Sequence, residues 1–355
     1  MIRSLLNNFF FIPKFLPHIN FKNKIRPYFG LPKRNYGGPN IRTKKMAQVF
    51  GNYFFSPNII YAQSWWSKEE LEDTISYSKK NKVPVIFNQN GWFYPAWYKN
   101  DWKIRNYTIV KVHKISKKVI FQSKFCKNTS IKLNNYCNKS NIIIYNPALI
   151  KKENKIIKSK IFKIIVTGVF GKESEHILLP ILKSINYIHK NKLAKFKYVL
   201  DIYGVVKEDM KSSNWFPEYK KIFQDLNKKQ LVFFHGKYKH HNIHNLLVNA
   251  NLALHLKYKD PCPNAVIEKL QYGIPHIFSN SGGTPELIQK AGISINVKES
   301  WNKMESVNYK ELSKKIILAK ENYKTLRKLA FKQGRKFGIH KYISQHKLIF
   351  EFLDN

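Results

Sequence analysis

The sequence predicts an α/β protein made of two successive doubly wound parallel-sheet domains. Short apolar, β-branched runs alternate with longer helical stretches along the 355-residue chain. The alternation is interrupted once, by a polar and charged stretch around residues 151–162, and then it restarts. Strands that alternate with helices form parallel sheets with right-handed crossovers. A chain of this length can build two domains that each bury a core.

The first half of the chain contains four strand-like runs and four stretches with helical periodicity. The runs are short and apolar, and breakers flank the helical stretches. We expect strands at 59–61, 83–87, 119–121 and 142–145, and helices at about 40–52, 68–80, 101–116 and 124–135.

The pattern restarts at Ile164 in the second half. A buried strand over 164–166 is followed by an apolar helical stripe from Ile177 to Ile188. Because two doubly wound units bind ligands at the carboxyl ends of their strands, we expect a ligand crevice between them. Further strands are expected at 198–203, 231–234, 252–256, 274–278 and 293–295, before a helical tail from about 308.

These patterns divide the chain into five parts. We expect an N-terminal extension over 1–23, a first Rossmann-like domain over 24–150 and a linker over 151–162. A second Rossmann-like domain then covers 163–335, and a C-terminal helix over 336–355 can pack back on the first domain.

The charge is strongly positive, with 63 Lys and Arg against 22 Asp and Glu and a formal net charge of +41. Compositional bias explains this charge if the lysines are spread evenly, and attraction to nucleic acid or an anionic membrane explains it if they are clustered. The lysines are spread along the chain, which favours bias, and no nucleic-acid module is recognisable. Each basic residue near an anionic bilayer still contributes up to ~1 kcal/mol. We therefore keep peripheral membrane contact as an expectation and expect no nucleic-acid partner.

Two further features bear on localisation. Cys126, Cys137 and Cys262 are too few and too scattered for a disulfide framework or a zinc site, which fits a reducing cytoplasm. The apolar run over residues 9–12 ends at Pro13, far short of the ~20 residues that a membrane-spanning helix needs. We expect a cytoplasmic protein whose N-terminal extension packs on the first domain or touches the membrane interface.

The stretch over residues 260–286 is the most informative about function. Asp260 follows the expected strand over 252–256, and Asn264 is expected to be the N-cap of a helix. The free N–H groups of residues 265–267 would then form an anion site for a diphosphate. Glu268 lies one turn further on the same face, and carboxylates accept hydrogen bonds from the paired hydroxyls of a ribose or hexose.

The combination resembles a known family. Asp260-x7-Glu268, followed by Tyr-Gly-Ile-Pro and Ser-Gly-Gly-Thr-Pro-Glu-Leu, is similar to the donor-binding signature of retaining family 4 glycosyltransferases, in glycosyl transferases group 1 with the GT-B fold. The family usually has Glu-x7-Glu, so the Asp retracts this carboxylate by one methylene. The resemblance implies that Glu268 holds the nucleotide ribose and that Asp260, the candidate catalytic carboxylate, contacts a donor-sugar hydroxyl. It implies that the remaining donor contacts in this stretch come from Pro263, Asn264, Gly282, Gly283 and Thr284.

The first domain adds weaker resemblances. Tyr-Gly-Gly-Pro-Asn at 36–40, with Gly38, is similar to the glycine-rich loop whose backbone approaches the donor phosphate. The segment over 87–92 ends a strand on the same cleft and makes Asn90 a substrate-binding candidate. Relatives often carry a His near Asn88, and this chain has none there.

The phosphate clamp departs from the family pattern. Relatives place an Arg and then a Lys after the first strand of the second domain, whereas residues 167–173 contain Lys172 as their only basic residue. Lys172 is therefore the second catalytic candidate. The resemblance also implies chemistry without a metal ion, and the nucleotide-sugar is a co-substrate, so no cofactor is expected.

The sequence thus predicts transfer of a sugar from a UDP- or GDP-sugar to a glycan or lipid-linked acceptor with retention of configuration. By resemblance, the product would be a surface polysaccharide or lipopolysaccharide. Two alternatives stay open: a basic nucleic-acid-binding protein, and a GT-B enzyme that epimerises a nucleotide-sugar.

Overall fold

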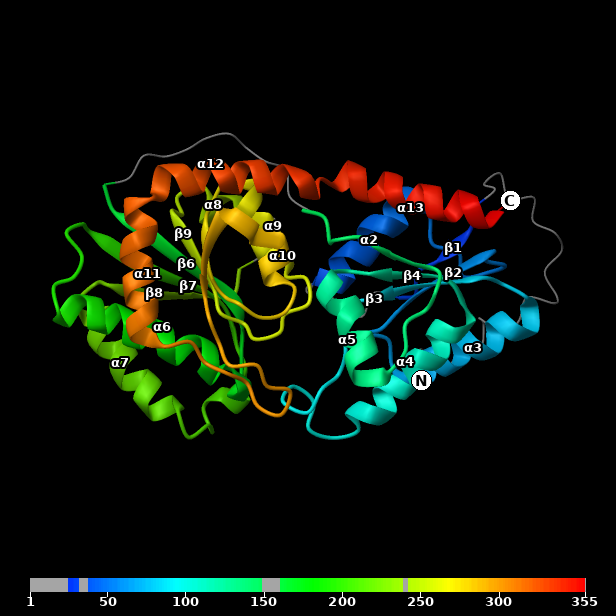
Figure 1. The fold of residues 1–355 in the computed structure, drawn as a ribbon, viewed down its shortest axis with the longest axis horizontal. Helices are drawn as coiled ribbons and strands as arrows, with labels where there is room; N and C mark the ends of the chain where they lie inside the picture. The colour runs from blue at the N-terminus through cyan, green and yellow to red at the C-terminus, as the bar shows by residue number, and fades with distance from the viewer. Residues whose placement is uncertain (1–24, 32–37, 149–159, 239–241, 355) are drawn as a thin grey trace. The chain divides into compact units, whose positions relative to one another are not determined.

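The computed structural model describes residues 25–31, 38–148, 160–238 and 242–354. The chain forms two compact units (Figure 1). The first comprises Met1–Tyr94, Tyr98–Tyr145 and Ile339–Asn355, and the second comprises Pro95–Trp97 and Asn146–Gly338. The expected extension over 1–23 and most of the expected linker over 151–162 lie outside the described residues.

The first unit is built around a parallel sheet. Its described strands are hydrogen-bonded in chain order: β1 (Pro27–Tyr28), β2 (Ile59–Gln63), β3 (Val85–Gln89), β4 (Ser116–Phe121) and β5 (Asn141–Ile143). The helices of this unit are α2 (Gly38–Phe50), α3 (Lys68–Asn81), α4 (Trp102–Ile115), α5 (Lys124–Asn134) and, from the end of the chain, α13 (Ile339–Asp354).

Both faces of this sheet are covered. Ile60 and Ala62 of β2 pack in a core with residues of α3, α4 and α5. Ile59 and Tyr61 point to the other face and pack with residues of α2 and with Phe350 of α13. Successive strand residues face opposite sides, so a sheet covered twice requires continuous apolar strands. This explains the unbroken apolar runs in the sequence.

The second unit contains a parallel sheet in the order β11-β10-β9-β6-β7-β8. Its strands are β6 (Phe162–Phe170), β7 (Tyr198–Val206), β8 (Val232–Gly236), β9 (Leu252–His255), β10 (His276–Ser279) and β11 (Gly292–Ile295). Its α-helices are α6 (Glu175–Lys190), α7 (Phe216–Lys228), α8 (Ile243–Leu247), α9 (Asn264–Gln271), α10 (Thr284–Ile288), α11 (Tyr309–Glu321) and α12 (Tyr323–Gly334). Within this unit α6 and α7 lie on one side of the sheet and α8 and α9 on the other (Figure 1).

The strand order of the second unit reverses between β6 and β9. The chain runs from β6 outward to β8, then returns to the other side of β6 and runs outward again to β11. Pairing between β6 and β9 ends at Ile165 and Ala253, although β6 continues beside β7 as far as Phe170. We call the carboxyl ends of β6 and β9 the switch point. Ligands of doubly wound sheets bind outside the sheet at such a reversal.

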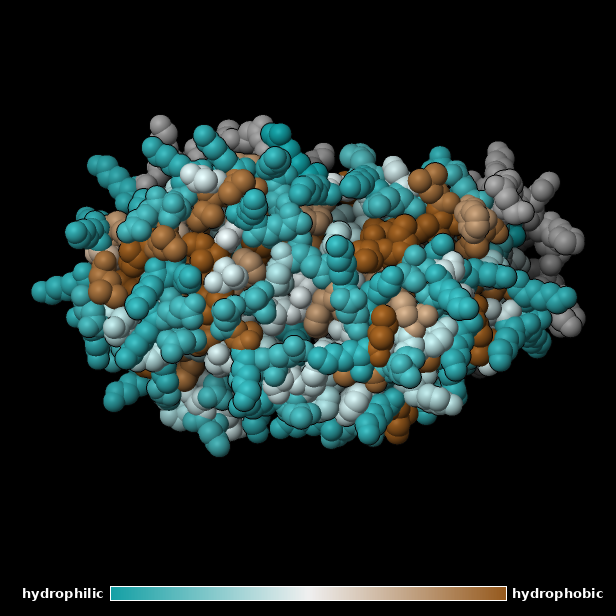
Figure 2. Space-filling view, viewed as in Figure 1, coloured by the Kyte–Doolittle hydropathy of each residue, from teal (hydrophilic) through white to brown (hydrophobic). Residues whose placement is uncertain are grey.

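The structure confirms the predicted α/β class and the two parallel-sheet units. Every strand expected from the sequence is present, with ends displaced by a few residues, and the short β1 was not predicted. Hydrophilic residues spread over most of the visible face, and hydrophobic residues form separate patches between them (Figure 2). In the described part of the chain, no helix has the length and apolarity needed to cross a bilayer.

Candidate functional site

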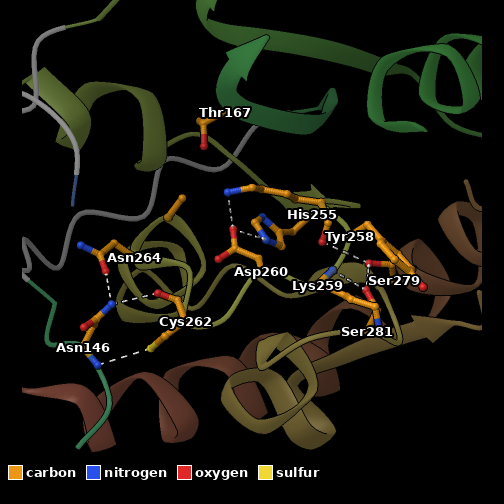
Figure 3. Close-up of polar contacts among 12 residues, drawn as sticks. Asn146, Thr167, His255, Tyr258, Lys259, Asp260, Cys262, Asn264, Ser279 and Ser281 are labelled. Carbon is orange, nitrogen blue, oxygen red and sulfur yellow. Dashed lines mark hydrogen bonds and ion pairs between the residues drawn. The ribbon is translucent and has the colours of Figure 1, made fainter. Parts of the chain in front are cut away.

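Asp260 lies in the loop that follows β9 at the switch point. Its carboxylate Oδ2 is 3.1 Å from Lys257 Nζ and 3.7 Å from His255 Nε2 (Figure 3). Burial lowers the pKa of His255 to about 4, so this imidazole is neutral at pH 7. Lys257 therefore supplies the positive charge beside Asp260. The carboxylate itself is largely buried, with 12% of its side chain exposed.

The loop before α10 packs directly on Asp260. The N–H of Gly283 donates to the Asp260 carbonyl oxygen at 2.8 Å. Gly282 has a φ of +70°, and a Cβ at this position would lie 2.5 Å from the same oxygen. The structure thus brings together the two loops that the sequence singled out, and it shows why a glycine is needed between them.

Lys259, the residue before Asp260, also holds the loop after β9 in place. Its N–H donates to Ser281 Oγ at 3.0 Å. Its ammonium lies 3.9 Å from the centre of the Trp301 ring and 3.4 Å from Glu299 Oε1, with 5% of the residue exposed. A desolvated cation over a Trp ring is a favourable contact, so it holds the loop firmly.

His176 of α6 joins the loops after β6 and β9. Its Nδ1–H donates to the Glu173 carbonyl at 2.8 Å, and its Nε2 accepts the Tyr258 N–H at 3.3 Å. Burial lowers the pKa of His176 to about 4. The neutral ring, with one donor and one acceptor, is the form that can make both contacts. Sequence reasoning missed this residue, because its partners lie on separate loops.

The start of α9 differs from the sequence-based expectation. Pro263 is the N-cap and Asn264 is the first helical residue. The N–H groups of Val266 and Ile267 both donate to the Pro263 carbonyl, at 3.1 and 3.3 Å. The expectation that residues 265–267 all present free N–H groups is therefore wrong for two of the three. The helix dipole still places partial positive charge at this end.

Asn146 holds the segment that leads into α9. Its Nδ2 donates to the Cys262 carbonyl at 2.9 Å and to Asn264 Oδ1 at 2.8 Å (Figure 3). Its main-chain N–H lies 3.4 Å from Cys262 Sγ. Asn264 thus uses its side-chain oxygen within the protein. Asn146 was not predicted, since more than a hundred residues separate it from the loop that it supports.

Glu268 lies inside the second unit, with 6% of the residue exposed. It is close enough to Tyr238, in the segment after β8, to affect that phenol. Burial and, secondarily, Glu268 raise the pKa of Tyr238 to about 12.

Lys269, the next residue of α9, is a buried cation that sequence reasoning missed. Its Nζ donates to Thr167 Oγ1 at 2.6 Å and to the Ala265 carbonyl at 3.2 Å. Only 4% of the residue is exposed, and burial lowers its pKa to about 8. A lysine close to the apolar residues Val266, Ile267 and Leu270 of the helix was the available signal.

Two of the other predicted residues in the second unit differ in their exposure. Lys172 is exposed, and its described contacts are made by its main chain, with Asp209 Oδ1 at 3.1 Å and Trp215 Nε1 at 3.0 Å. Thr284 is fully buried at the start of α10. Within the described ranges, no group of three His, Cys, Asp or Glu side chains could hold a metal ion.

The first unit contains Gly38 and Asn90. Gly38 begins α2, and the preceding part of its glycine-rich loop lies outside the described residues. Asn90 follows β3, and its Oδ1 accepts from Arg42 at 3.2 Å and from Gln122 at 2.7 Å. Its N–H donates to Ser64 Oγ at 2.9 Å. Asn90 therefore belongs to a polar network at the carboxyl ends of β2, β3 and β4.

Comparison with solved structures gives similar folds at low identity. A structure of HepE from Anabaena in complex with UDP is 14% identical, with a TM-score of 0.66 over 88% of this chain and 82% of that chain. Sucrose-phosphate synthase from Thermosynechococcus elongatus is 13% identical, with a TM-score of 0.62 over 89% and 77%. The lipopolysaccharide outer core galactosyltransferase WaaB is 13% identical, with a TM-score of 0.57 over 87% and 79%.

Comparison of the sequence with curated proteins gave no match. The model of the family described as glycosyl transferases group 1 matches residues 150–337, which is more than half of the chain and includes the whole switch point. The chain therefore belongs to the glycosyl transferases group 1 family and has the GT-B fold.

Proposed function

We propose that this protein transfers a sugar from a UDP- or GDP-sugar to a glycan or lipid-linked acceptor, with retention of anomeric configuration. The observation that carries the proposal is the arrangement at the switch point, where Asp260, the Gly282–Gly283 loop and the start of α9 are held together. A relative in fold was solved with UDP bound, which supports a nucleoside diphosphate donor.

In this proposal the residues of the second unit bind the donor. The first turn of α9 faces the diphosphate, and Glu268 accepts hydrogen bonds from the ribose hydroxyls. Asp260 accepts a hydrogen bond from a hydroxyl of the donor sugar. Its position beside Lys257 and its anchored main chain fix its orientation, so binding needs little rearrangement.

The proposed reaction proceeds on one face of the sugar. The bond from the anomeric carbon to the diphosphate oxygen breaks, and the acceptor hydroxyl oxygen forms its bond to that carbon from the same side. The acceptor proton passes to the departing phosphate oxygen. Placement of the two substrates and electrostatic stabilisation of the leaving diphosphate supply the catalysis. We propose that the protein's own positive charge serves the diphosphate, with no metal ion or cofactor.

The acceptor side of the proposal rests on weaker support. WaaB, which shares the fold, acts on the outer core of lipopolysaccharide. A formal charge of +41 favours contact with an anionic membrane, where a lipid-linked acceptor would be found. We propose that the enzyme works in surface polysaccharide or lipopolysaccharide synthesis, from the cytoplasmic side and in peripheral contact with the inner membrane.

Release of nucleotide from a panel of UDP- and GDP-sugars tests the proposal. Loss of a charged hydrogen bond costs about 1.5–3 kcal/mol, so Glu268→Ala should weaken donor binding roughly 10- to 150-fold. Asp260→Asn should lower turnover. Glu218→Ala is the matched control, because Glu218 of α7 pairs with Lys183 of α6 in a partly exposed ion pair. Unchanged donor affinity and turnover in Glu268→Ala would refute the site, and an isomerised donor without acceptor would indicate an epimerase.

A further inference from the structure

We infer that Lys269 supplies the positive charge that holds the donor diphosphate, an inference that rests on the proposed function. The chain has no arginine in residues 167–173, and Lys172, the lysine there, is exposed and attached through its main chain. A cation that is already held in place for the diphosphate would therefore come from another element. Lys269 is a lysine of α9 whose side chain ends at the switch point.

The position of the ammonium follows from helix geometry. A side chain on a helix leans toward the N-terminus, and Lys269 Nζ reaches the carbonyl of Ala265, one turn earlier. The ammonium thus lies beside the first turn of α9, where the helix dipole is positive. The ammonium of Lys269 and the N-terminus of α9 therefore both contribute positive charge at the first turn of the helix.

The contact with Thr167 places the ammonium of Lys269 where strands β6 and β9 separate. Thr167 lies on β6, two residues beyond the last pair that joins β6 to β9 at Ile165 and Ala253. Its hydroxyl accepts from Lys269 at 2.6 Å and points toward the loop that carries Asp260 (Figure 3). Lys269 consequently bridges β6 and α9 at the point where a doubly wound sheet binds its ligand.

The described hydrogen-bond partners of the ammonium are uncharged. A lysine has three N–H donors, and two of them go to a hydroxyl and a carbonyl. Burial, and to a lesser extent the charge of Lys269, lowers the pKa of His255 of β9 and His276 of β10, so both rings are neutral at pH 7. Glu268, beside it on α9, raises the pKa of Lys269 against the larger effect of burial, and it is the carboxylate that we assign to the ribose.

Burial of an ammonium is costly unless an anion compensates it. A diphosphate at the start of α9 would add a second anion to Glu268 and would use the third N–H donor. Thr167, whose hydroxyl also hydrogen-bonds Tyr238, holds the ammonium in place before the ligand arrives. A preorganised cation of this kind stabilises the negative charge that develops on the leaving diphosphate.

Calorimetric titration with UDP and with uridine separates the contribution of the diphosphate to binding from that of the nucleoside. GDP and guanosine replace them if the enzyme uses a guanine nucleotide. Lys269→Met keeps an unbranched side chain, one atom shorter, with similar helix propensity, but removes the charge. We expect it to weaken UDP binding at least about tenfold and to leave uridine binding within about twofold of wild type. Lys220→Met, an exposed lysine of α7, is the matched control and should bind both as wild type does.

Failure of the proposed function and failure of the role of Lys269 give different results. Binding of neither nucleotide by the wild-type protein would refute the proposed function itself. Wild-type UDP affinity in Lys269→Met would refute only the role of Lys269, as would an equal loss of UDP and uridine binding, which would indicate a structural lysine. Glu268→Ala should differ from Lys269→Met by weakening uridine and UDP alike. Lys172→Met, if it alone lost UDP affinity, would transfer the role to Lys172.

Discussion

Gly282 has a φ of +70°, and a Cβ at this residue would lie 2.5 Å from the carbonyl oxygen and 2.7 Å from the nitrogen of Asp260. Both atoms belong to the main chain, so they cannot move aside as a flexible side chain would. The main chain of Asp260 and the hydrogen bond from Gly283 depend on this close approach. The geometry of the loop around Asp260 therefore depends on the absence of a side chain at Gly282.

Gly282→Ala should destabilise the second unit more than the same substitution at a glycine that has a similar positive φ but open space around it. Gly236 is the control, because its φ is +72° and a Cβ there would meet no atom within 4 Å. We expect Gly236→Ala to cost about 1–2 kcal/mol and Gly282→Ala a further ~1–3 kcal/mol, measured by urea unfolding. Equal losses for the two variants would contradict the packing described at Asp260.

Some features of individual residues in the site could be read from the sequence, and others could not. Asp260, Glu268 and the glycine loop could be singled out as candidates, because their spacing is local and each residue type has a defined chemical use. The occupied N–H groups of Val266 and Ile267 could not, because they depend on where the Pro263 carbonyl points. Partners from distant segments were equally hidden from a local pattern.

The loop into α9 shows how an element is held for binding. Asn146, which begins the main segment of the second unit, makes side-chain hydrogen bonds to Cys262 and Asn264. It is 4% exposed, so its amide is shielded from water. A buried hydrogen bond lost on one side leaves its partner unsatisfied, which costs about 1–3 kcal/mol.

Asn146→Ala should therefore lower both stability and donor affinity. We expect a loss of about 1–3 kcal/mol in the free energy of unfolding, together with weaker UDP binding, because the first turn of α9 is no longer fixed. Asn191→Ala, which removes an exposed hydrogen bond at the end of α6, is the comparison for both measurements. UDP affinity equal to wild type in Asn146→Ala would show that this anchor does not serve the site.

Whole elements were the most predictable level of the structure. Runs such as Ile59–Gln63 and Val85–Gln89 are buried on both faces, and such strands leave a continuous apolar signal. β1 was missed because two residues are too few to show periodicity. The start of α9 was displaced by one residue, because Asn264 bonds to Asn146 instead of capping the helix.

Across the whole molecule, buried histidines make stability depend on pH. Burial lowers the pKa of His113 to about 3 and of His176, His255 and His346 to about 4. An unfolded chain protonates these rings near pH 6.5. Between these values the unfolded state binds more protons than the folded state, so stability is present above pH 6.5 and is lost as the pH falls.

Thermal unfolding at pH 7 and pH 5 checks this expectation. Each such histidine contributes a slope of up to about 1.4 kcal/mol per pH unit, and the four are distributed over both units. We expect the transitions of both units to move to lower temperature at pH 5. Replacement of the exposed His189 by Gln should leave the pH dependence as it is in wild type. Transitions that do not move between pH 7 and pH 5 would contradict burial of these rings.

A crystal structure after soaking with UDP or GDP will show whether the switch point of the second unit binds the diphosphate of a nucleotide. We expect a diphosphate beside the first turn of α9 within hydrogen-bond distance of Lys269 Nζ, and a ribose whose hydroxyls contact Glu268. A nucleotide bound elsewhere on the molecule, or in contact with neither side chain, would contradict it.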